Sequence, residues 1–314
     1  MNTLAIVMRA PRELELDRVG LTAPGDEDVV VDVQFSGVSA GTERLLWSGR
    51  MPPFPGMGYP LVPGYESVGR VVDAGAGARA RIGETVFVPG ANCYRDVRGL
   101  FGGAARRVIT PARRVTKVNE QTDAQEAVLL ALAATAQHAL AARDAHAPEL
   151  IVGHGALGRL LARLTIANGH AAPTVWERNP QRRSGAQNYR VIDPAEDERR
   201  DYRAIYDVSG DADILDELLM RLAPRGEIVL AGFYDQRPNF SFVPAFMREA
   251  RLRVAAEWQP EDLAAVQELI AQKKLTLDGL ITHCRDAASA NEAYRTAFED
   301  PSCLKMVLDW RTCS

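Results

Sequence analysis

The stretch "LIVGHGALGRLLARL", residues 150–164, decides the fold of the second half of the chain. A short apolar run, which we predict to be a strand, leads into three glycines spaced GxGxxG, and an apolar pattern of helical period follows. The first glycine permits the tight turn, the second lets the backbone approach a pyrophosphate, and the third lets helix and strand pack closely. The helix N-terminus attracts the phosphate charge. We therefore predict a dinucleotide site with contacts from Gly153, Gly155, Ala156, Leu157 and Gly158.

The acid after the next predicted strand bears on the identity of the dinucleotide. "PTVWE" ends at Glu177, roughly twenty residues beyond the glycines, where an acid accepts hydrogen bonds from ribose hydroxyls. Its charge would repel the extra phosphate of NADP, which favours NAD. Arg178, Arg182 and Arg183 would suit that phosphate, so NADP stays open, as does a turn without a nucleotide. His154 either touches the phosphates or faces solvent.

Strands and helices alternate on both sides of this motif. We predict helices from 156 to about 168, over "ILDELLMRLAPRG" and from about 261 to 273, with strands "YRVID", "AIYDVSG" and "EIVLAGF" between them. This alternation is typical of an α/β fold with a doubly wound, parallel Rossmann sheet. We expect this dinucleotide-binding domain to span 123–268, with a tail over 269–314.

The first part of the chain has a different texture. Short β runs such as "DVVVDVQFSGVSAG" and "ETVFVPG" lie between Gly and Pro turns, which predicts a mostly β, barrel-like domain over 1–122. Residues 45–63 read as an irregular loop rich in Pro, Gly and Met. The run "DAQEAVLLALAATAQHALAARDA" predicts a linking helix that begins near Asp123.

Composition excludes several classes of protein. The chain has 314 residues and a net charge of -4 without a basic cluster, which argues against a nucleic-acid partner. It shows no signal-peptide pattern and no apolar run of about eighteen residues, so we expect a cytoplasmic protein without a membrane span. The four cysteines lie far apart without a CxxC pair and are expected to be free thiols.

Several motifs together resemble the medium-chain dehydrogenase/reductase superfamily over the whole chain: "SGVSAGTE", "PGYESVGRV", "LLALAATAQHAL" and the glycine turn. The resemblance implies a GroES-like catalytic domain, a Rossmann domain and a tail that returns to the catalytic domain. It also carries the expectation of a homodimer through an exposed edge of the Rossmann sheet.

Longer runs are similar to the bacteriochlorophyllide a dehydrogenase family: "LLWSGRMPPFPGMGYPLVPGYESVGRVVDAG", "VFVPGANCY", "GLFGGAA" and "FMREARLRVAAEW". That similarity implies NAD-linked oxidation of the 3-(1-hydroxyethyl) group of a magnesium tetrapyrrole to acetyl. The residues alone support only an NAD-dependent oxidoreductase.

The resemblance also locates where zinc members of the superfamily hold their metal. The three catalytic ligand positions correspond here to Ala40, Tyr65 and Ala131, and the structural lobe retains only Cys93. A methyl group cannot coordinate, and a phenol with a pKa of about 10 is a poor ligand beside thiolate or imidazole. We therefore expect neither a catalytic nor a structural zinc.

Without a metal, another group must take the hydroxyl proton and stabilise the oxygen. Thr42 matches the hydroxyl residue of the family's proton relay. Tyr65 could donate to the substrate oxygen, or deprotonate it if a positive charge lowered its pKa, and the alternative is a packed ring. His138 on the linking helix is a candidate base or magnesium ligand, or else a core or surface residue. Glu43 is a further candidate base, whereas we interpret Glu66 as a structural partner.

The loop after residue 45 is the candidate substrate wall. Methionine and aromatic side chains there would suit a flat macrocycle, and the alternative is that they fold back onto the barrel. Arg44 or Arg50 would pair with a propionate or would be merely solvated. The candidate substrate contacts are Trp47, Arg50, Met51, Phe54, Met57 and Tyr59.

Two other functions remain open from the sequence. One is a zinc-independent, NADPH-dependent reductase of quinones or enones, which needs no alcohol base. The other is a non-catalytic tetrapyrrole-binding protein, which would bind the pigment without a nicotinamide cofactor.

Overall fold

The computed structural model describes residues 1–53 and 55–313, which form two compact units. Unit 1 consists of Met1–Ala131 and Ile281–Ser314, and unit 2 of Leu132–Leu280. Helix α2 (Leu130–Leu140) therefore crosses the division. The limits expected from sequence lay at 122 and 268. Of the predicted site residues, Phe54 lies outside the described residues.

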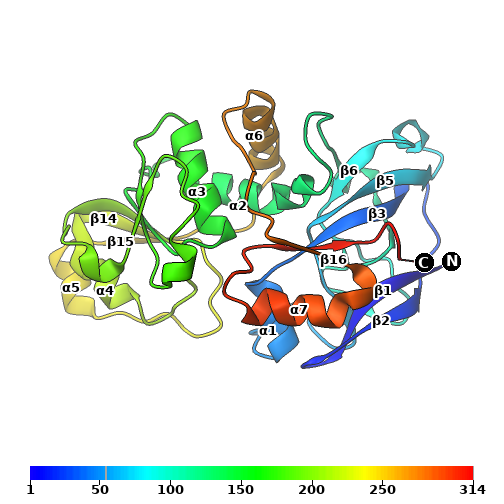
Figure 1. Cartoon of the computed structure of the whole chain (residues 1–314), viewed down its shortest axis with the longest axis horizontal. Helices are drawn as coiled ribbons and strands as arrows, with labels where there is room; N and C mark the ends of the chain where they lie inside the picture. Colours follow the sequence, from blue (N-terminus) through cyan, green and yellow to red (C-terminus); the bar gives the residue numbers. More distant parts are fainter. Residues whose placement is uncertain (54, 314) are drawn as a thin grey trace. The chain divides into compact units, whose positions relative to one another are not determined.

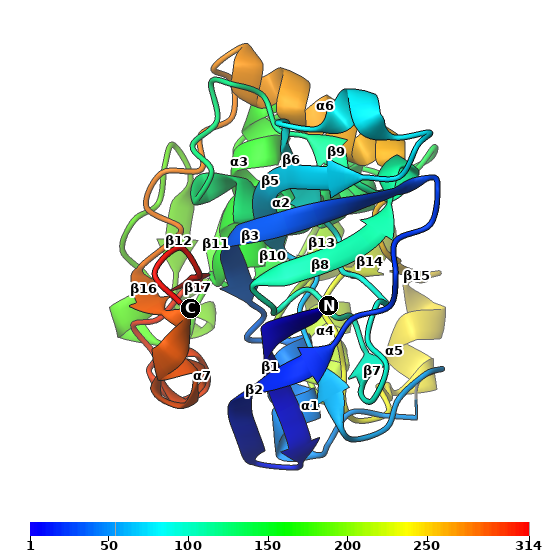
Figure 2. The same cartoon turned by 90° about the vertical axis from the view of Figure 1, so that its right-hand side faces the viewer.

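Unit 1 is built from two sheets. Strands of the first, in spatial order, are β2 (Glu13–Gly20), β1 (Asn2–Ala10), β4 (Leu61–Val62) and β7 (Arg98–Gly99). The second has the order β16 (His283–Asp286), β17 (Met306–Asp309), β3 (Asp28–Val38), β5 (Ser67–Ala74), β6 (Thr85–Val88) and β9 (Thr116–Lys117). Strand β8 (Arg107–Pro111) also pairs with β3, antiparallel to it (Figure 2).

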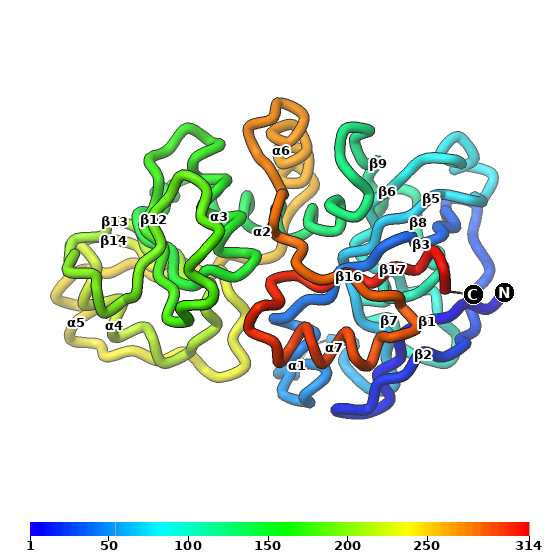
Figure 3. Tube along the Cα trace, viewed as in Figure 1, coloured from blue at the N-terminus to red at the C-terminus, as the bar shows by residue number. Residues whose placement is uncertain are grey.

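The C-terminal segment completes unit 1. Strand β17 pairs antiparallel with β3, and β16 continues the sheet beyond β17 (Figure 3). Between them α7 (Ala290–Glu299) buries Ala293, Tyr294 and Ala297 and contacts β2 (Figure 1). The closing residues of the chain therefore belong to the same core as its first strands.

Unit 2 contains one parallel sheet of six strands. Its order is β12 (Arg190–Ile192), β11 (Thr174–Trp176), β10 (Leu150–Val152), β13 (Tyr202–Asp207), β14 (Leu222–Leu230) and β15 (Arg251–Val254). Its helices are α3 (Ala156–Ala167), α4 (Leu215–Arg221), α5 (Phe242–Met247) and α6 (Pro260–Ala271). Strand β10, which precedes the glycine turn, lies in the middle of this sheet. The order reverses there, as in dinucleotide-binding folds, so the predicted fold class is confirmed.

Two local predictions were wrong. The expected loop 45–63 contains most of α1 (Thr42–Ser48), because Leu45 and Leu46 are buried on one turn and Gly49 ends the helix in the left-handed region, and it also contains β4. The helix expected over 214–226 ends at Arg221, and β14 follows it directly. Pro224 explains the change, because proline lacks the N–H that a helix interior uses.

The linking helix begins with a 3-10 turn, Glu126–Leu129, and continues as α2. Asp123 accepts hydrogen bonds from the backbone N–H groups of Gln125 and Glu126 just before this turn, whereas the α-helix itself begins later than expected, at Leu130. Among the described residues, no helix is long and apolar enough to cross a membrane.

Candidate functional site

Three side-chain hydroxyls meet in unit 1 at the place where β3 runs into α1. The Tyr65 hydroxyl lies 2.8 Å from Ser39 Oγ and 3.0 Å from Thr42 Oγ1, and the two smaller hydroxyls are 3.1 Å apart. We call Ser39, Thr42 and Tyr65 the hydroxyl triangle. It brings together the predicted residues Thr42 and Tyr65 and adds Ser39. Such a triangle can hold and orient an alcohol oxygen through neutral hydrogen bonds.

Tyr65 is held as a neutral phenol. Its ring is half-buried and meets Phe101 edge-on, with ring centres 5.2 Å apart. Burial, followed by the negative charge of Glu66, raises the pKa of Tyr65 far above its usual value. The lowered pKa that a phenolate base would require is therefore the reverse of what these surroundings produce. The geometry suits Tyr65 as a hydrogen-bond donor.

Glu43 lies directly beneath the triangle and is fully buried on α1. Its Oε1 accepts the backbone N–H of Ser39 at 3.1 Å, and its Oε2 accepts the Tyr294 hydroxyl at 2.7 Å. Burial raises the pKa of Glu43 to about 7, although both hydrogen bonds act in the opposite direction. A carboxyl group that exchanges its proton near neutral pH therefore sits one residue from Thr42.

Glu66 and Lys305 form a buried ion pair beside this carboxyl group. Gly37 makes the pair fit, because a Cβ there would lie 2.2 Å from Glu66 Oε2 and 2.9 Å from Lys305 Cε. The interpretation of Glu66 as a structural partner agrees with this arrangement. A buried ion pair is costly to break, since the remaining charge has no compensation.

The donors at the expected zinc positions do not fit a zinc ion. Ala40 is exposed and Ala131 is buried, and both end in a methyl group. Within residues 1–53 and 55–313, no three His, Cys, Asp or Glu side chains gather as a metal site would need. Cys93 is buried, its pKa is raised to about 11 by burial, and all four cysteines are free.

The apolar segment lies against the core of unit 1. Trp47, Met51, Met57 and Tyr59 are half-buried and pack on that core. The Trp47 ring lies 5.6 Å from the ring of Phe298 on α7. Their inner faces thus fold back onto the barrel. Arg44 and Arg50 are exposed, and Arg50 Nε donates to Ser48 Oγ at 3.3 Å.

His138 lies on α2 and is bound to another helix of unit 2. Its Nδ1 is 2.8 Å from Asp262 Oδ2, and the same oxygen accepts the backbone N–H of Gln259 at the start of α6. Asp262 therefore joins His138 to the N-terminal cap of α6. This arrangement gives the imidazole a structural role in fixing α6.

The glycine turn of unit 2 has the geometry expected of a dinucleotide site. Gly158 packs so closely that a Cβ would lie 1.9 Å from the Gly153 carbonyl oxygen, whereas a Cβ on Gly155 would meet nothing within 4 Å. Open space therefore lies where a pyrophosphate would approach the N-terminus of α3. Glu177 accepts the backbone N–H of His154 at 3.2 Å and that of Asn179 at 2.8 Å. Each carboxylate oxygen keeps a lone pair for a ribose hydroxyl.

Two of the nearby arginines already bind acids. Arg178 donates to Glu217 at 3.1 Å and lies 3.8 Å from Asp211. Arg183 is paired with Asp193 and also donates to the carbonyl of Glu177. A 2′-phosphate would therefore compete with carboxylates for both guanidinium groups. His154 is buried, so the alternative in which it faces solvent was wrong.

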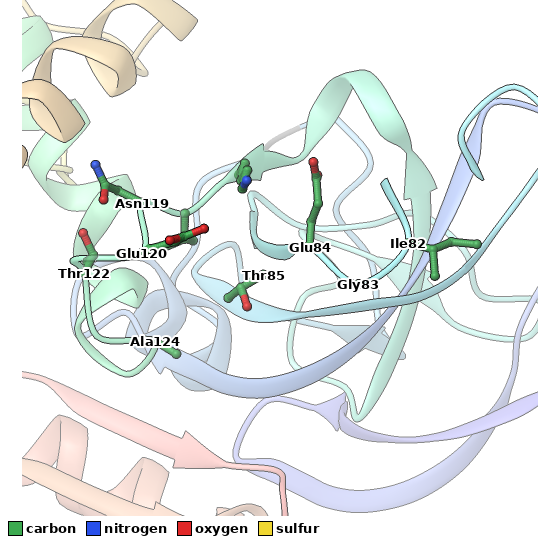
Figure 4. A pocket seen from close by; sticks show the side chains of 10 residues that line it. Ile82, Gly83, Glu84, Thr85, Asn119, Glu120, Thr122 and Ala124 are labelled. Atoms are coloured by element: carbon green, nitrogen blue, oxygen red, sulfur yellow. The ribbon is translucent and has the colours of Figure 1, made fainter. Parts of the chain in front are cut away.

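A pocket of about 470 Å³ opens elsewhere on unit 1 (Figure 4). It is lined by residues of 82–85 and 117–124, among them Glu84, Thr85, Asn119 and Glu120. None of the predicted site residues lines it. We assign it no part in the chemistry.

Sequence reasoning missed several residues of these clusters. Ser39 lies inside the motif "SGVSAGTE", so the sequence contained a signal that could have identified it. Tyr294 and Lys305 had no sequence signal, because only the return of the C-terminal segment to β3 brings them to Glu43 and Glu66.

The chain is similar in sequence and in fold to known dehydrogenases. The family model of the alcohol dehydrogenase GroES-like domain matches residues 25–120. The chain is 57% identical over 316 residues to the 2-desacetyl-2-hydroxyethyl bacteriochlorophyllide A dehydrogenase of Cereibacter sphaeroides, covering 99% of each protein. It is 58% identical over 312 residues to the enzyme of that name from Rhodobacter capsulatus, again covering 99% of each.

The chain belongs to the medium-chain dehydrogenase/reductase superfamily. Within it, the chain is a member of the family of these two dehydrogenases, and is thus an oxidoreductase of the alcohol dehydrogenase type. A dehydrogenase from Escherichia coli in complex with NADH shares its fold, with a TM-score of 0.84 at 21% identity over 98% of this chain and 99% of that one. The 2R,3R-butanediol dehydrogenase of Bacillus subtilis does so with a TM-score of 0.82 at 17% identity, over 98% and 99%.

Proposed function

We propose that this chain oxidises the 3-(1-hydroxyethyl) group of a bacteriochlorophyllide or chlorophyllide to 3-acetyl, with NAD as the oxidant and without catalytic zinc. The observation that carries the proposal is the 57% and 58% identity to dehydrogenases of such a substrate over nearly the whole chain. In the reaction the carbinol carbon loses a hydride and the hydroxyl loses a proton, which leaves a ketone.

NAD supplies the hydride acceptor, and the chain supplies binding and charge. Gly153, Gly155 and Gly158 would hold the pyrophosphate, with Ala156 and Leu157 in the first turn of α3. The Glu177 carboxylate would bind the adenosine ribose and repel a 2′-phosphate. Arg178 supports NAD over NADP because it already binds acids.

The hydroxyl triangle takes the place of the metal in this proposal. Tyr65 and Thr42 hold the substrate oxygen, and the neutral phenol stabilises negative charge that develops on it. Ser39 links the triangle to Glu43, since its Oγ accepts from Tyr65 and its N–H donates to the carboxylate. A peptide N–H cannot pass a proton on, so the hydroxyl proton would leave the substrate through the exchangeable hydroxyls of Thr42 and Ser39, and Glu43, with a pKa of about 7, would take it up as the neighbouring carboxyl group. The donor set at the family's ligand positions supports a reaction without zinc.

The macrocycle is assigned to the segment after α1. Trp47, Met51, Met57 and Tyr59 keep half-exposed faces that suit a flat apolar ring. Arg50, which is exposed beside them, is the proposed partner of the propionate carboxylate. We leave His138 out of the chemistry because its Nδ1 is bound to Asp262.

A metal-stripped preparation tests the proposal. The protein is dialysed against a chelator, shown to be zinc-free, and incubated with NAD and the hydroxyethyl bacteriochlorophyllide while the pigment spectrum is recorded. We expect turnover to acetyl product at the rate of untreated protein. Activity that returns only with added zinc would overturn the metal-free reaction. Reduction of quinones with NADPH and no pigment turnover would favour the reductase, and pigment binding without NAD binding would favour a carrier.

We also propose that two copies of the chain pair through β15. This strand is an edge of the six-stranded sheet, and Val254 on it is 75% exposed. The adjoining helix α5 exposes Phe242, Val243, Phe246 and Met247, an apolar surface unusual for a monomer. Two edges related by a twofold axis would cover each other. Sedimentation should show a dimer in the wild type and a monomer in Phe246→Asp, and a wild-type monomer would contradict the pairing.

A further inference from the structure

His154 stands inside the glycine turn, yet its side chain points into unit 2. It is fully buried, with Nδ1 2.6 Å from the carbonyl oxygen of Arg182 and Nε2 2.9 Å from the hydroxyl of Tyr189. Both partners belong to residues 178–189, the loop between β11 and β12. These two hydrogen bonds connect the glycine turn to the loop.

The partners fix the protonation state of the ring. A carbonyl oxygen only accepts, so Nδ1 must carry a hydrogen. Nε2 then accepts from the Tyr189 hydroxyl. Burial, which lowers the pKa of His154 to about 4, keeps this neutral form at physiological pH. The contact is therefore a permanent one and involves no charge.

Arg159, one turn into α3, binds the same loop. It is buried, and its guanidinium donates to the carbonyl oxygens of His154 at 3.1 Å, Arg182 at 3.1 Å, Ser184 at 2.8 Å and Gly185 at 3.2 Å. Arg182 is thus held twice through one carbonyl oxygen. The glycine turn and the 178–189 loop are fastened together by His154 and Arg159.

We propose that His154, supported by Arg159, is a positioning residue that holds the 178–189 loop against the glycine turn and so sets the discrimination between NAD and NADP. The inference rests on the proposed use of a nicotinamide cofactor. Glu177 directly precedes this loop and accepts the backbone N–H of His154, so the position of the loop determines where the carboxylate lies. The loop also carries Arg178, Arg182 and Arg183, the residues suited to a 2′-phosphate.

Preorganisation explains why the clamp would favour NAD. When the loop is fixed, the carboxylate of Glu177 is in place before the ribose arrives, and binding costs no further ordering of the loop. When the loop is loose, that ordering must accompany binding, and the arginines gain freedom to turn toward a phosphate. Loss of the clamp should therefore weaken NAD and affect NADP less.

The test measures dinucleotide binding by calorimetry, without the pigment. In His154→Leu we expect the Kd for NAD to rise about tenfold, the size of two lost neutral hydrogen bonds, while the Kd for NADP changes less than about threefold. His154→Asn keeps a donor toward Arg182 and should recover part of the loss. Amide exchange over 178–189 should quicken in His154→Leu.

A matched pair of variants guards against misfolding of His154→Leu. Tyr189→Phe removes the hydroxyl that meets His154, and Tyr206→Phe removes a buried hydroxyl bound to the carbonyl of His146 in the same unit. Tyr189→Phe should lower the ratio of the Kd for NADP to the Kd for NAD by about threefold, and Tyr206→Phe should leave this ratio unchanged. An unchanged ratio in His154→Leu and Tyr189→Phe would overturn the positioning role alone. A wild type that binds neither dinucleotide would overturn the proposed cofactor and, with it, this inference.

Discussion

Two buried polar clusters, one around Glu43 in unit 1 and one around His154 in unit 2, treat charge in opposite ways. In unit 1, two carboxylates, Glu43 and Glu66, share the surroundings of one ammonium group, and Lys305 is paired with Glu66. Glu43 has hydroxyl and amide donors only, and burial raises its pKa although these donors act in the opposite direction. In unit 2, the guanidinium of Arg159 is surrounded by backbone carbonyls, and His154 stays neutral.

The difference lies in the partners. Backbone carbonyls cannot titrate, and the pKa of His154 is about 4, so the charge of the unit 2 cluster does not change near neutral pH. Carboxylates can titrate, and burial, with a smaller contribution from the charge of Glu66, brings the pKa of Glu43 to about 7. The first cluster therefore suits proton transfer, and the second suits geometry.

The largest effect is expected when the ammonium of unit 1 is removed. Lys305→Met leaves Glu66 buried without a counter-charge, and the free energy of unfolding should fall by about 3–5 kcal/mol in urea titrations. Arg225→Met, which breaks the exposed pair with Glu249, serves as the control and should not change it measurably. An equal decrease in the free energy of unfolding in the two variants would show that the buried pair contributes no more to stability than the exposed one.

The next effect concerns the hydroxyl triangle. Tyr65→Phe removes one donor to the substrate oxygen, and kcat for alcohol oxidation should fall about 100-fold while the Kd for NAD stays the same. Tyr94→Phe removes a buried hydroxyl of unit 1 that donates to the Gly102 carbonyl, and it should leave kcat unchanged. If kcat is unchanged in Tyr65→Phe, the phenol is a packing residue.

The sequence predicted the strands, helices and glycine turn that position the site better than it predicted the side-chain contacts within it. The glycine turn, the acid at Glu177 and the alternating strands are local patterns, and local patterns determine a doubly wound sheet. Thr42 and Tyr65 were both named as candidates through the family resemblance, because both stand in its motifs. Helix α1 was missed since its buried leucines adjoin a segment dominated by Pro and Gly.

The electrostatics of the site was beyond the sequence. Burial raises the pKa of Glu43 and its hydrogen bond from Tyr294 opposes that rise, while Glu66 is paired with Lys305. Tyr294 and Lys305 both come from the far end of the chain. No spacing rule connects such residues. His154 shows the same limit within one unit, because nothing in "GHGALG" tells whether the imidazole faces outward or binds the loop at Arg182 and Tyr189.

The third effect sharpens the contrast through pH. The pKa of Glu43 is raised in the folded state, so the folded protein keeps a proton that the unfolded chain releases above about pH 4.5. The stability from this group is present below that pH and is lost as pH rises toward 7. Glu43→Gln should abolish this slope and raise the free energy of unfolding above pH 7 by about 2 kcal/mol.

The same variant should change the pH profile of the reaction. In the wild type kcat/KM should rise with pH through about 7 as Glu43 becomes ionised and able to accept a proton. Glu43→Gln should be slow and lack that rise. Glu120→Gln, an exposed carboxylate of unit 1, is the control for the lost charge. A rise near pH 7 that persists in Glu43→Gln would assign the proton to another group.

The smallest effect is expected in unit 2, where the variant tests whether the negative charge of Glu177 determines the choice of dinucleotide. Glu177→Gln removes the negative charge and keeps one oxygen, so one of the backbone N–H groups of His154 and Asn179 loses its acceptor. The Kd for NAD should therefore rise about tenfold and that for NADP should fall. Calorimetry with both dinucleotides measures the change, with the exposed Glu196→Gln as control. The loop is held by the neutral His154 and by the guanidinium of Arg159, which stays protonated in proteins, so the Kd of Glu177→Gln for NAD should be independent of pH between about 6 and 8. A Kd for NAD that varied over this range would mean that the unit 2 cluster titrates as the unit 1 cluster does, since NAD itself carries no group that titrates there.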